Sequence, residues 1–193
     1  MKKKLLFLMM LIIPVLFTNC FIYESAETRI KIDRDETGEY AKVTSIYNNI
    51  SSCEAKEEDA KKDFESLLEM VQGDEYLMDE ADKGMYWKER DMWVEKDQVQ
   101  AKQVGITRDF DLLQKEYGLI HMGDEYLIVL KKEDNILLET NGKQVETDTN
   151  LIIYWNQEQK DLYFKVKPTD DCGSFDVNQK KMVKWVKEYK SQN

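Results

Sequence analysis

The chain is poor in histidine, cysteine, proline and glycine, with one, three, two and eight of them among 193 residues. So few prolines and glycines exclude a Pro/Gly-rich disordered chain. A single histidine, His121, argues against a His-built zinc site and against a Ser-His-Asp triad. The sequence also lacks a glycine-rich phosphate loop, a G-x-S-x-G elbow and a Cys-x-x-Cys pair. We therefore expect no catalytic residue, no metal site and no cofactor.

Basic residues are also in deficit, with 28 Lys and Arg against 38 Asp and Glu and a net charge of −10. Nucleic-acid binding needs basic surface that displaces counterions, so we expect no nucleic-acid partner. The shares of charged residues, 34 %, and of hydrophobic residues, 42 %, exclude a multi-span membrane protein.

One uncharged apolar run stands out at the start of the chain. Residues 2–4 are three lysines, and residues 5–17 carry no charge. Thirteen helical residues span about 20 Å, too short for a hydrocarbon core of about 30 Å. The length and the lysines are typical of a secretory signal peptide, and we assign residues 1–19 to it.

The run ends in Phe17-Thr18-Asn19-Cys20, which resembles the lipobox of bacterial lipoproteins. The resemblance implies cleavage before Cys20, diacylation of its thiol and export to a bacterial membrane that holds the chain by lipid. The next residue is Phe21 and not the Asp of an inner-membrane retention signal, which favours the outer membrane. The resemblance depends on Cys20 alone, since Phe17 and Asn19 depart from the usual Leu and Gly or Ala.

Lipidation of Cys20 leaves Cys53 and Cys172. Exported chains reach an oxidising space, where two remaining thiols tend to pair. A bridge between them would close a loop of about 120 residues and stabilise the domain by about 3–5 kcal/mol. The alternative is two separate buried thiols, which pack as small hydrophobes.

The remaining pattern predicts a short tether over residues 20–27 and one domain over residues 28–193. Alternation predicts a β-hairpin over residues 28–50, with Ala41, Val43, Ser45 and Tyr47 on one face. Apolar residues at helical spacing predict a helix that Ser51 or Ser52 caps and Gly73 ends. The apolar face of this helix comprises Ala60, Phe64, Leu67, Leu68 and Val71.

The later segments complete a mainly antiparallel α+β fold. Residues 73–84 are predicted as a loop, residues 108–117 as a short middle helix and residues 177–189 as a C-terminal helix. Two strands are expected within residues 85–106. Five more are expected over residues 126–130, 136–140, 143–147, 151–155 and 162–166. Short turns between strands favour antiparallel pairing, with helices on one face or at one end of the sheet.

The turns between the later strands predict hairpins. Asn141 and Gly142 are the favoured pair for a two-residue type I′ turn, in which both positions need positive φ. Residues 131–135 and 156–161 are predicted as further hairpin turns.

Two tryptophans are candidate binding residues. In strict alternation, Trp87 and Trp93 share a face of one strand together with Glu89 and Asp91. One interpretation is that both pack across the sheet onto a helix. The other is an exposed aromatic strip that binds a protein or a glycan.

These observations leave three hypotheses on function. The first is a non-enzymatic envelope lipoprotein, a binding or structural module whose partner is another envelope or external macromolecule such as a protein. The second is an exported carrier with a closed apolar cavity. The third is a hydrolase with a pair of carboxylates, one of them with a raised pKa.

Overall fold

The computed structural model describes residues 21–169 and 172–192. The predicted signal peptide and the predicted acylation site, Cys20, lie outside the described residues. The elements in chain order are β1 (Phe21–Asp35), β2 (Gly38–Ser52), α1 (Glu57–Gln72), α2 (Asp74–Asp82), β3 (Tyr86–Glu95), β4 (Gln98–Thr107), α3 (Phe110–Tyr117), β5 (Ile120–Met122), β6 (Glu125–Lys131), β7 (Asn135–Thr140), β8 (Lys143–Glu146), β9 (Asn150–Asn156), β10 (Asp161–Pro168) and α4 (Phe175–Gln192).

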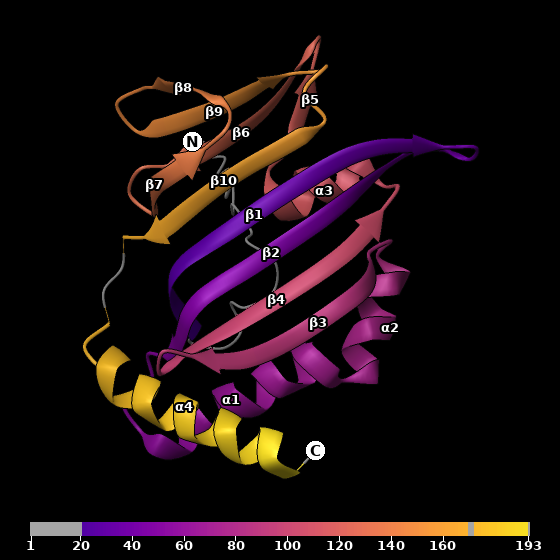
Figure 1. Ribbon diagram of the computed structural model, residues 1–193. Helices are drawn as coiled ribbons and strands as arrows, with labels where there is room; N and C mark the ends of the chain where they lie inside the picture. The colour runs from indigo at the N-terminus through magenta and orange to yellow at the C-terminus, as the bar shows by residue number, and fades with distance from the viewer. Residues whose placement is uncertain (1–20, 170–171, 193) are drawn as a thin grey trace, which may run out of the picture.

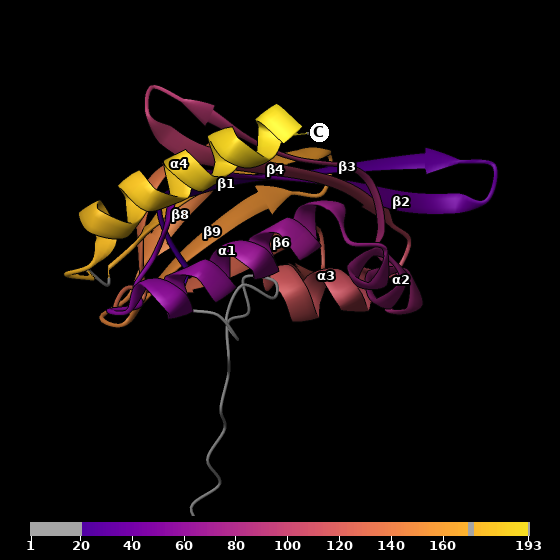
Figure 2. The same cartoon turned by 90° about the horizontal axis from the view of Figure 1, so that it is seen from below.

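The strands form two antiparallel sheets, which confirms the predicted α+β class (Figure 1). The larger sheet has the order β3-β4-β2-β1-β10-β7, and the smaller sheet has the order β5-β6-β9-β8. Helices α1, α2 and α3 and the smaller sheet lie on one side of the larger sheet (Figure 2). The main hydrophobic core fills the space between these layers.

The hairpin β1–β2 is longer than the sequence predicts and replaces the expected tether. Pairing runs from Phe21 opposite Ser52 to Asp35 opposite Gly38. The tether prediction for residues 20–27 is therefore wrong from Phe21 onward. The physical reason is that Phe21 and Tyr23 are buried side chains, so the apolar alternation of the strand begins at the first described residue.

The predicted apolar face of β2 and the predicted helix behind it are confirmed. Ala41, Val43 and Tyr47 are buried core residues, and Ser45 is buried with them. Four of the five predicted apolar residues of α1 are fully buried, and Leu68 packs against the core.

The boundaries of the first helices differ from the prediction. Ser51 and Ser52 end strand β2, and α1 begins five residues later at Glu57 without a side-chain cap. The predicted loop over residues 73–84 is wrong because it contains α2. Its first turn carries Asp74 and Glu75, which suit the positive end of the helix dipole.

Strands β3 and β4 form the expected hairpin, and its turn is at Lys96 and Asp97. Both residues have positive φ, 50° and 57°, as a type I′ turn requires. A register shift between Trp87 and Glu89 leaves Lys88 as an extra residue in β3. Such a bulge reverses the facing of every later side chain in the strand.

The predicted hairpin at Asn141 and Gly142 is wrong. Strand β7 pairs with β10 in the larger sheet, and β8 pairs with β9 in the smaller sheet. Neither Asn141 nor Gly142 has positive φ. The glycine is required for close approach, because a Cβ atom there would lie 2.6 Å from the Trp155 ring and 2.7 Å from Ile153.

The other two predicted hairpin turns also cross between sheets. Residues 131–135 connect β6 of the smaller sheet to β7 of the larger one, and residues 156–161 connect β9 to β10. Both connections are short, as in a hairpin, but the strands that they join do not pair with each other. Burial of the two sheets against each other decides which strands pair.

The middle and C-terminal helices are confirmed. Asp109 caps α3 by accepting hydrogen bonds from two backbone N–H groups, and Gly118 ends it with a left-handed φ of 66°. Helix α4 lies across the end of the larger sheet, with Asn178 bound to the end of β2 and Lys190 paired with Asp91 of β3.

Candidate functional site

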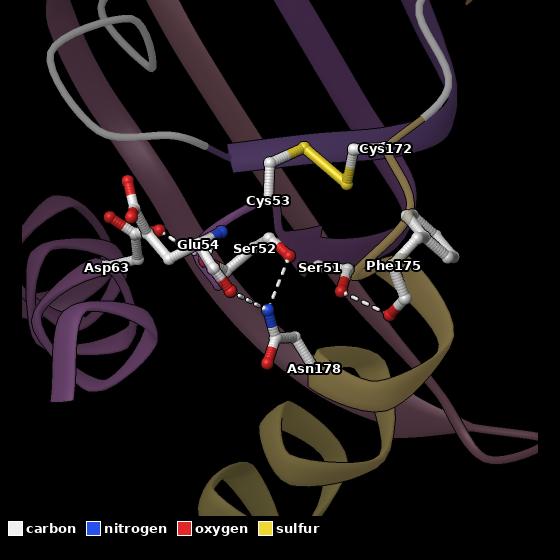
Figure 3. Close-up of a disulfide and its surroundings, with 8 residues drawn as sticks. All are labelled: Ser51, Ser52, Cys53, Glu54, Asp63, Cys172, Phe175 and Asn178. Atoms are coloured by element: carbon white, nitrogen blue, oxygen red, sulfur yellow. Dashed lines mark hydrogen bonds between the residues drawn. A yellow bond between two sulfur atoms is a disulfide. The ribbon is translucent and has the colours of Figure 1, made fainter. Parts of the chain in front are cut away.

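Cys53 and Cys172 lie at disulfide distance, with their Cα atoms 5.6 Å apart (Figure 3). Cys53 directly follows β2, and Cys172 comes shortly before α4. The pair therefore joins the end of the long hairpin to the start of the C-terminal helix across 119 residues of sequence.

Buried hydrogen bonds surround this pair and hold the same two segments together (Figure 3). The Asn178 side-chain amide donates to the carbonyl oxygens of Ser52, at 2.9 Å, and Glu54, at 2.7 Å. Ser51 donates from its hydroxyl to the carbonyl oxygen of Phe175 at 2.9 Å. Asn178 is only 3 % exposed, so these bonds satisfy polar atoms that water cannot reach.

Trp87 and Trp93 do not share a face. The bulge at Lys88 leaves Trp87 on the covered side of the sheet together with Met92, and both are buried. Trp93, the neighbour of Met92, faces the other way and is partly exposed. The structure therefore provides no aromatic strip made of these two residues.

A second group of polar side chains lies between the helices and the larger sheet. We call it the tyrosine–carboxylate cluster, and it consists of Ser45, Tyr47, Tyr76, Glu80, Gln103, Glu116 and Tyr117. Burial raises the pKa of Tyr47 to about 12 and that of Tyr117 well above its usual value. One carboxylate oxygen of Glu116 is buried without a hydrogen-bond partner.

The cluster contains two carboxylates in different environments. Glu80 is 5 % exposed and accepts a 2.7 Å ion-pair contact from Lys83. Burial, and secondly the charge of Glu80, raise the pKa of Glu116. This matches part of the requirement for a carboxylate-based hydrolase, but neither residue lines the surface pocket described below.

The raised pKa of Glu116 predicts a pH dependence of stability. The folded protein holds the Glu116 proton more tightly than the unfolded chain does. The protonated Glu116 therefore contributes to the free energy of unfolding, and this contribution is fully present below the pKa of the unfolded chain. It is lost as the pH rises through the folded pKa. Glu116→Gln should raise Tm at pH 7 by on the order of 1–2 °C and change it little below pH 4. Thermal unfolding followed by circular dichroism at several pH values tests this, with Glu65→Gln, at an exposed position of α1, as a control.

A surface pocket that contains the exposed Tyr86 ring lies at the end of the larger sheet that is far from Phe21. Its volume is about 530 Å³, and it is lined by Gly84, Tyr86, Ile106, Thr107, Arg108 and Asp109. Tyr86 is 55 % exposed and pairs directly with Ile106 across the two strands. This far-end pocket is an open notch and not the closed apolar cavity that a carrier needs.

Arg108 connects the far-end pocket to the tip of the long hairpin. Its guanidinium contacts the Asp35 carboxylate at 2.5 Å, donates to the Gly38 carbonyl oxygen and lies 5.4 Å from the centre of the Tyr40 ring. The hydrogen bond from Arg108 holds the pKa of Asp35 well below its usual range. The acidic turn over residues 33–38 is thus fixed beside the pocket.

The sequence indicated the stretch that contains Tyr86 but selected the wrong aromatic residues. Strict alternation, which takes no account of the bulge at Lys88, predicts that Trp87 and Trp93 lie on one face. In the structure the exposed aromatic ring of this stretch is that of Tyr86. No local signal in the sequence links Arg108 to Asp35, since 73 residues separate them.

Other candidate features are accounted for by ordinary contacts. His121 stacks on Tyr126, with ring centres 4.8 Å apart. Among residues 21–169 and 172–192, no three His, Cys, Asp or Glu side chains are grouped as metal ligands. No helix in this described part of the chain has the length and apolar character to cross a membrane.

Comparison with known proteins gives no family model, no curated protein and no solved structure that matches this chain. A functional hypothesis therefore depends on the sequence features and on the geometry of this fold.

Proposed function

We propose that this protein is a lipoprotein of a bacterial cell envelope, anchored by an acylated Cys20, that works as a binding module. The bilayer that receives the acyl chains is its membrane partner, and the outer membrane is favoured over the inner one. Its second partner is another envelope protein or an external protein, which we assign to the far-end pocket.

The observation that carries this proposal is the position of Phe21. This residue follows Cys20 directly and begins a strand of 15 residues that crosses the whole domain (Figure 1). At about 3.3 Å per residue the strand spans about 46 Å. An anchor at Cys20 would therefore keep the Tyr86 and Arg108 side chains well away from the bilayer, where an external partner can reach them.

The anchor is tested by mass and by fractionation of the native protein. We expect a chain that begins at Cys20, carries acyl mass and incorporates labelled palmitate. Cys20→Ala should move nearly all of the protein from the membrane fraction to the soluble fraction. An unacylated chain that is cleaved elsewhere would overturn the anchor.

The pocket is tested by site-specific photo-crosslinking in intact cells. A photoreactive residue at position 86 should capture a protein, whereas the same residue at position 177, exposed on α4, should not capture that protein. Equal capture at both positions, or none at position 86, would contradict a partner at the far-end pocket while leaving the anchor result unaffected.

A further inference from the structure

The smaller sheet has an unusual sequence pattern in its two central strands. Residues 126–130 of β6 read YLIVL and residues 151–155 of β9 read LIIYW, without a polar residue in either run. An antiparallel sheet with one solvated face normally alternates apolar and polar residues. Uninterrupted apolar runs are typical of strands that are covered on both faces.

The structure covers only one of these two faces. Tyr126, Ile128 and Leu130 of β6 are buried in the core. Their neighbours Leu127 and Val129 point to the other side, beside Tyr154 and Ile152 of β9, and all four are partly exposed. The edge strands extend this outer face with Met122, 64 % exposed, and Val145, 48 % exposed.

The outer face is self-complementary. Along β6 its residues are Glu125, Leu127, Val129 and Lys131, so an acid stands at one end and a base at the other. Ile128 of β6 pairs with Ile153 of β9, so the two strands share one centre. Suppose that a second copy packs its outer face on this one, with the two β6 strands on top of each other and running in opposite directions. The two-fold axis then lies between the two faces, perpendicular to β6 at Ile128. This arrangement places Glu125 opposite Lys131 of the second copy.

The same rotation matches the second central strand, β9. Leu127 falls opposite Val129 of the second copy, and Tyr154 falls opposite Ile152. At the ends of β9, Asn150 falls opposite Asn156. We propose that the outer face of the smaller sheet is the surface through which two copies of this chain associate, with the two sheets packed face to face about this axis.

The dimensions of the sheet set the strength of this association. The strands β5, β6, β9 and β8 contribute 3, 7, 7 and 4 residues. At about 3.4 Å per residue and about 4.8 Å per strand, they give a face of about 340 Å² per copy. The total of about 700 Å² is well below the usual range of stable interfaces, so we expect a weak dimer that forms only at high micromolar concentration. Two chains that share a membrane would reach such effective concentrations readily.

The test is sedimentation velocity of the full chain carrying Cys20→Ser, from about 1 µM to 500 µM. We expect a concentration-dependent shift from monomer to dimer. Ile152→Glu should abolish the shift, and the matched control Val177→Glu, at an exposed apolar residue of α4, should leave it unchanged. Because no anchor is present, the result is independent of the lipoprotein proposal.

Charge exchange distinguishes a second copy from any other occupant. Glu125→Lys and Lys131→Glu should each weaken dimerisation about tenfold, because each places like charges opposite each other. The double variant should restore it to within about twofold. Circular dichroism checks that each variant is folded. A monomer at all concentrations, or a dimer that Ile152→Glu does not change, would overturn the proposal. Binding of monomers to phosphatidylglycerol vesicles through this face would assign it to lipid instead and would also overturn it.

Discussion

Removal of the Cys53–Cys172 bridge is expected to lower the free energy of unfolding by about 3–5 kcal/mol. The pair encloses 119 residues of sequence separation, so an intact bridge strongly restricts the unfolded chain. For a domain of this size the loss corresponds to a fall in Tm of about 10–15 °C. Urea unfolding of the Cys53→Ala/Cys172→Ala variant measures the change.

Reduction provides the internal control for this prediction. Dithiothreitol should destabilise the wild-type chain by about the same amount and should leave the double variant unaffected. The hydrogen bonds from Asn178 to Ser52 and Glu54 should still hold α4 in place, so the reduced protein should remain folded at 25 °C. Equal stability with and without dithiothreitol in the wild type would contradict a bridging role.

Asn141→Ala should have the second largest effect, a loss of about 2–4 kcal/mol in the free energy of unfolding. The side-chain oxygen of Asn141 accepts from the Trp155 ring N–H at 2.7 Å and from the Tyr163 backbone N–H at 2.9 Å. Its amide group donates to the Asp161 carbonyl oxygen at 2.8 Å. Alanine would leave the N–H of Trp155, a residue only 1 % exposed, without a partner.

Two further variants separate this effect from a general one. Asn141→Asp keeps the accepting oxygen and loses the donor, so it should cost less than Asn141→Ala. Asn150→Ala, at a partly exposed asparagine of β9 whose side-chain amide donates to the Thr149 hydroxyl, should change stability by less than about 0.5 kcal/mol. Chemical unfolding of all three variants measures these differences. An Asn141→Ala variant as stable as Asn150→Ala would show that the hydrogen bonds of Asn141 do not stabilise the connection between β7 and β8.

Two short connections, at Lys96-Asp97 and at Asn141-Gly142, show why some predictions from the sequence succeeded and others failed. Lys96 and Asp97 form a tight hairpin turn although neither is glycine, and Asn141 and Gly142 do not form one although they are the favoured pair. In the first case the flanking strands belong to one sheet. In the second case Trp155 and Tyr163, distant in sequence, occupy the hydrogen-bonding groups of the asparagine.

For individual side chains, too, the prediction succeeded where local periodicity was sufficient and failed where it was not. Periodicity correctly placed Ala41, Val43 and Tyr47 in the core, since alternation on a regular strand needs only local information. It failed for Trp93 because one extra residue at Lys88 reverses the facing of the strand beyond it. The pairing of Arg108 with Asp35 brings together residues from two elements and had no periodic signal.

The sequence by itself determined the α+β class, the buried faces of β2 and α1, and the presence of the short helix α3, because these depend on contacts within a few residues. It also indicated Cys53 and Cys172 as the pair to join, on the expectation that the lipobox-like Cys20 is acylated. Only the tertiary structure decided that Phe21 already belongs to the first strand, that β7 and β8 belong to different sheets, and that the Tyr86 ring is exposed. The physical reason is that burial of a sheet face is shared by segments far apart in the chain, and the energy of that shared burial exceeds any local turn or strand preference.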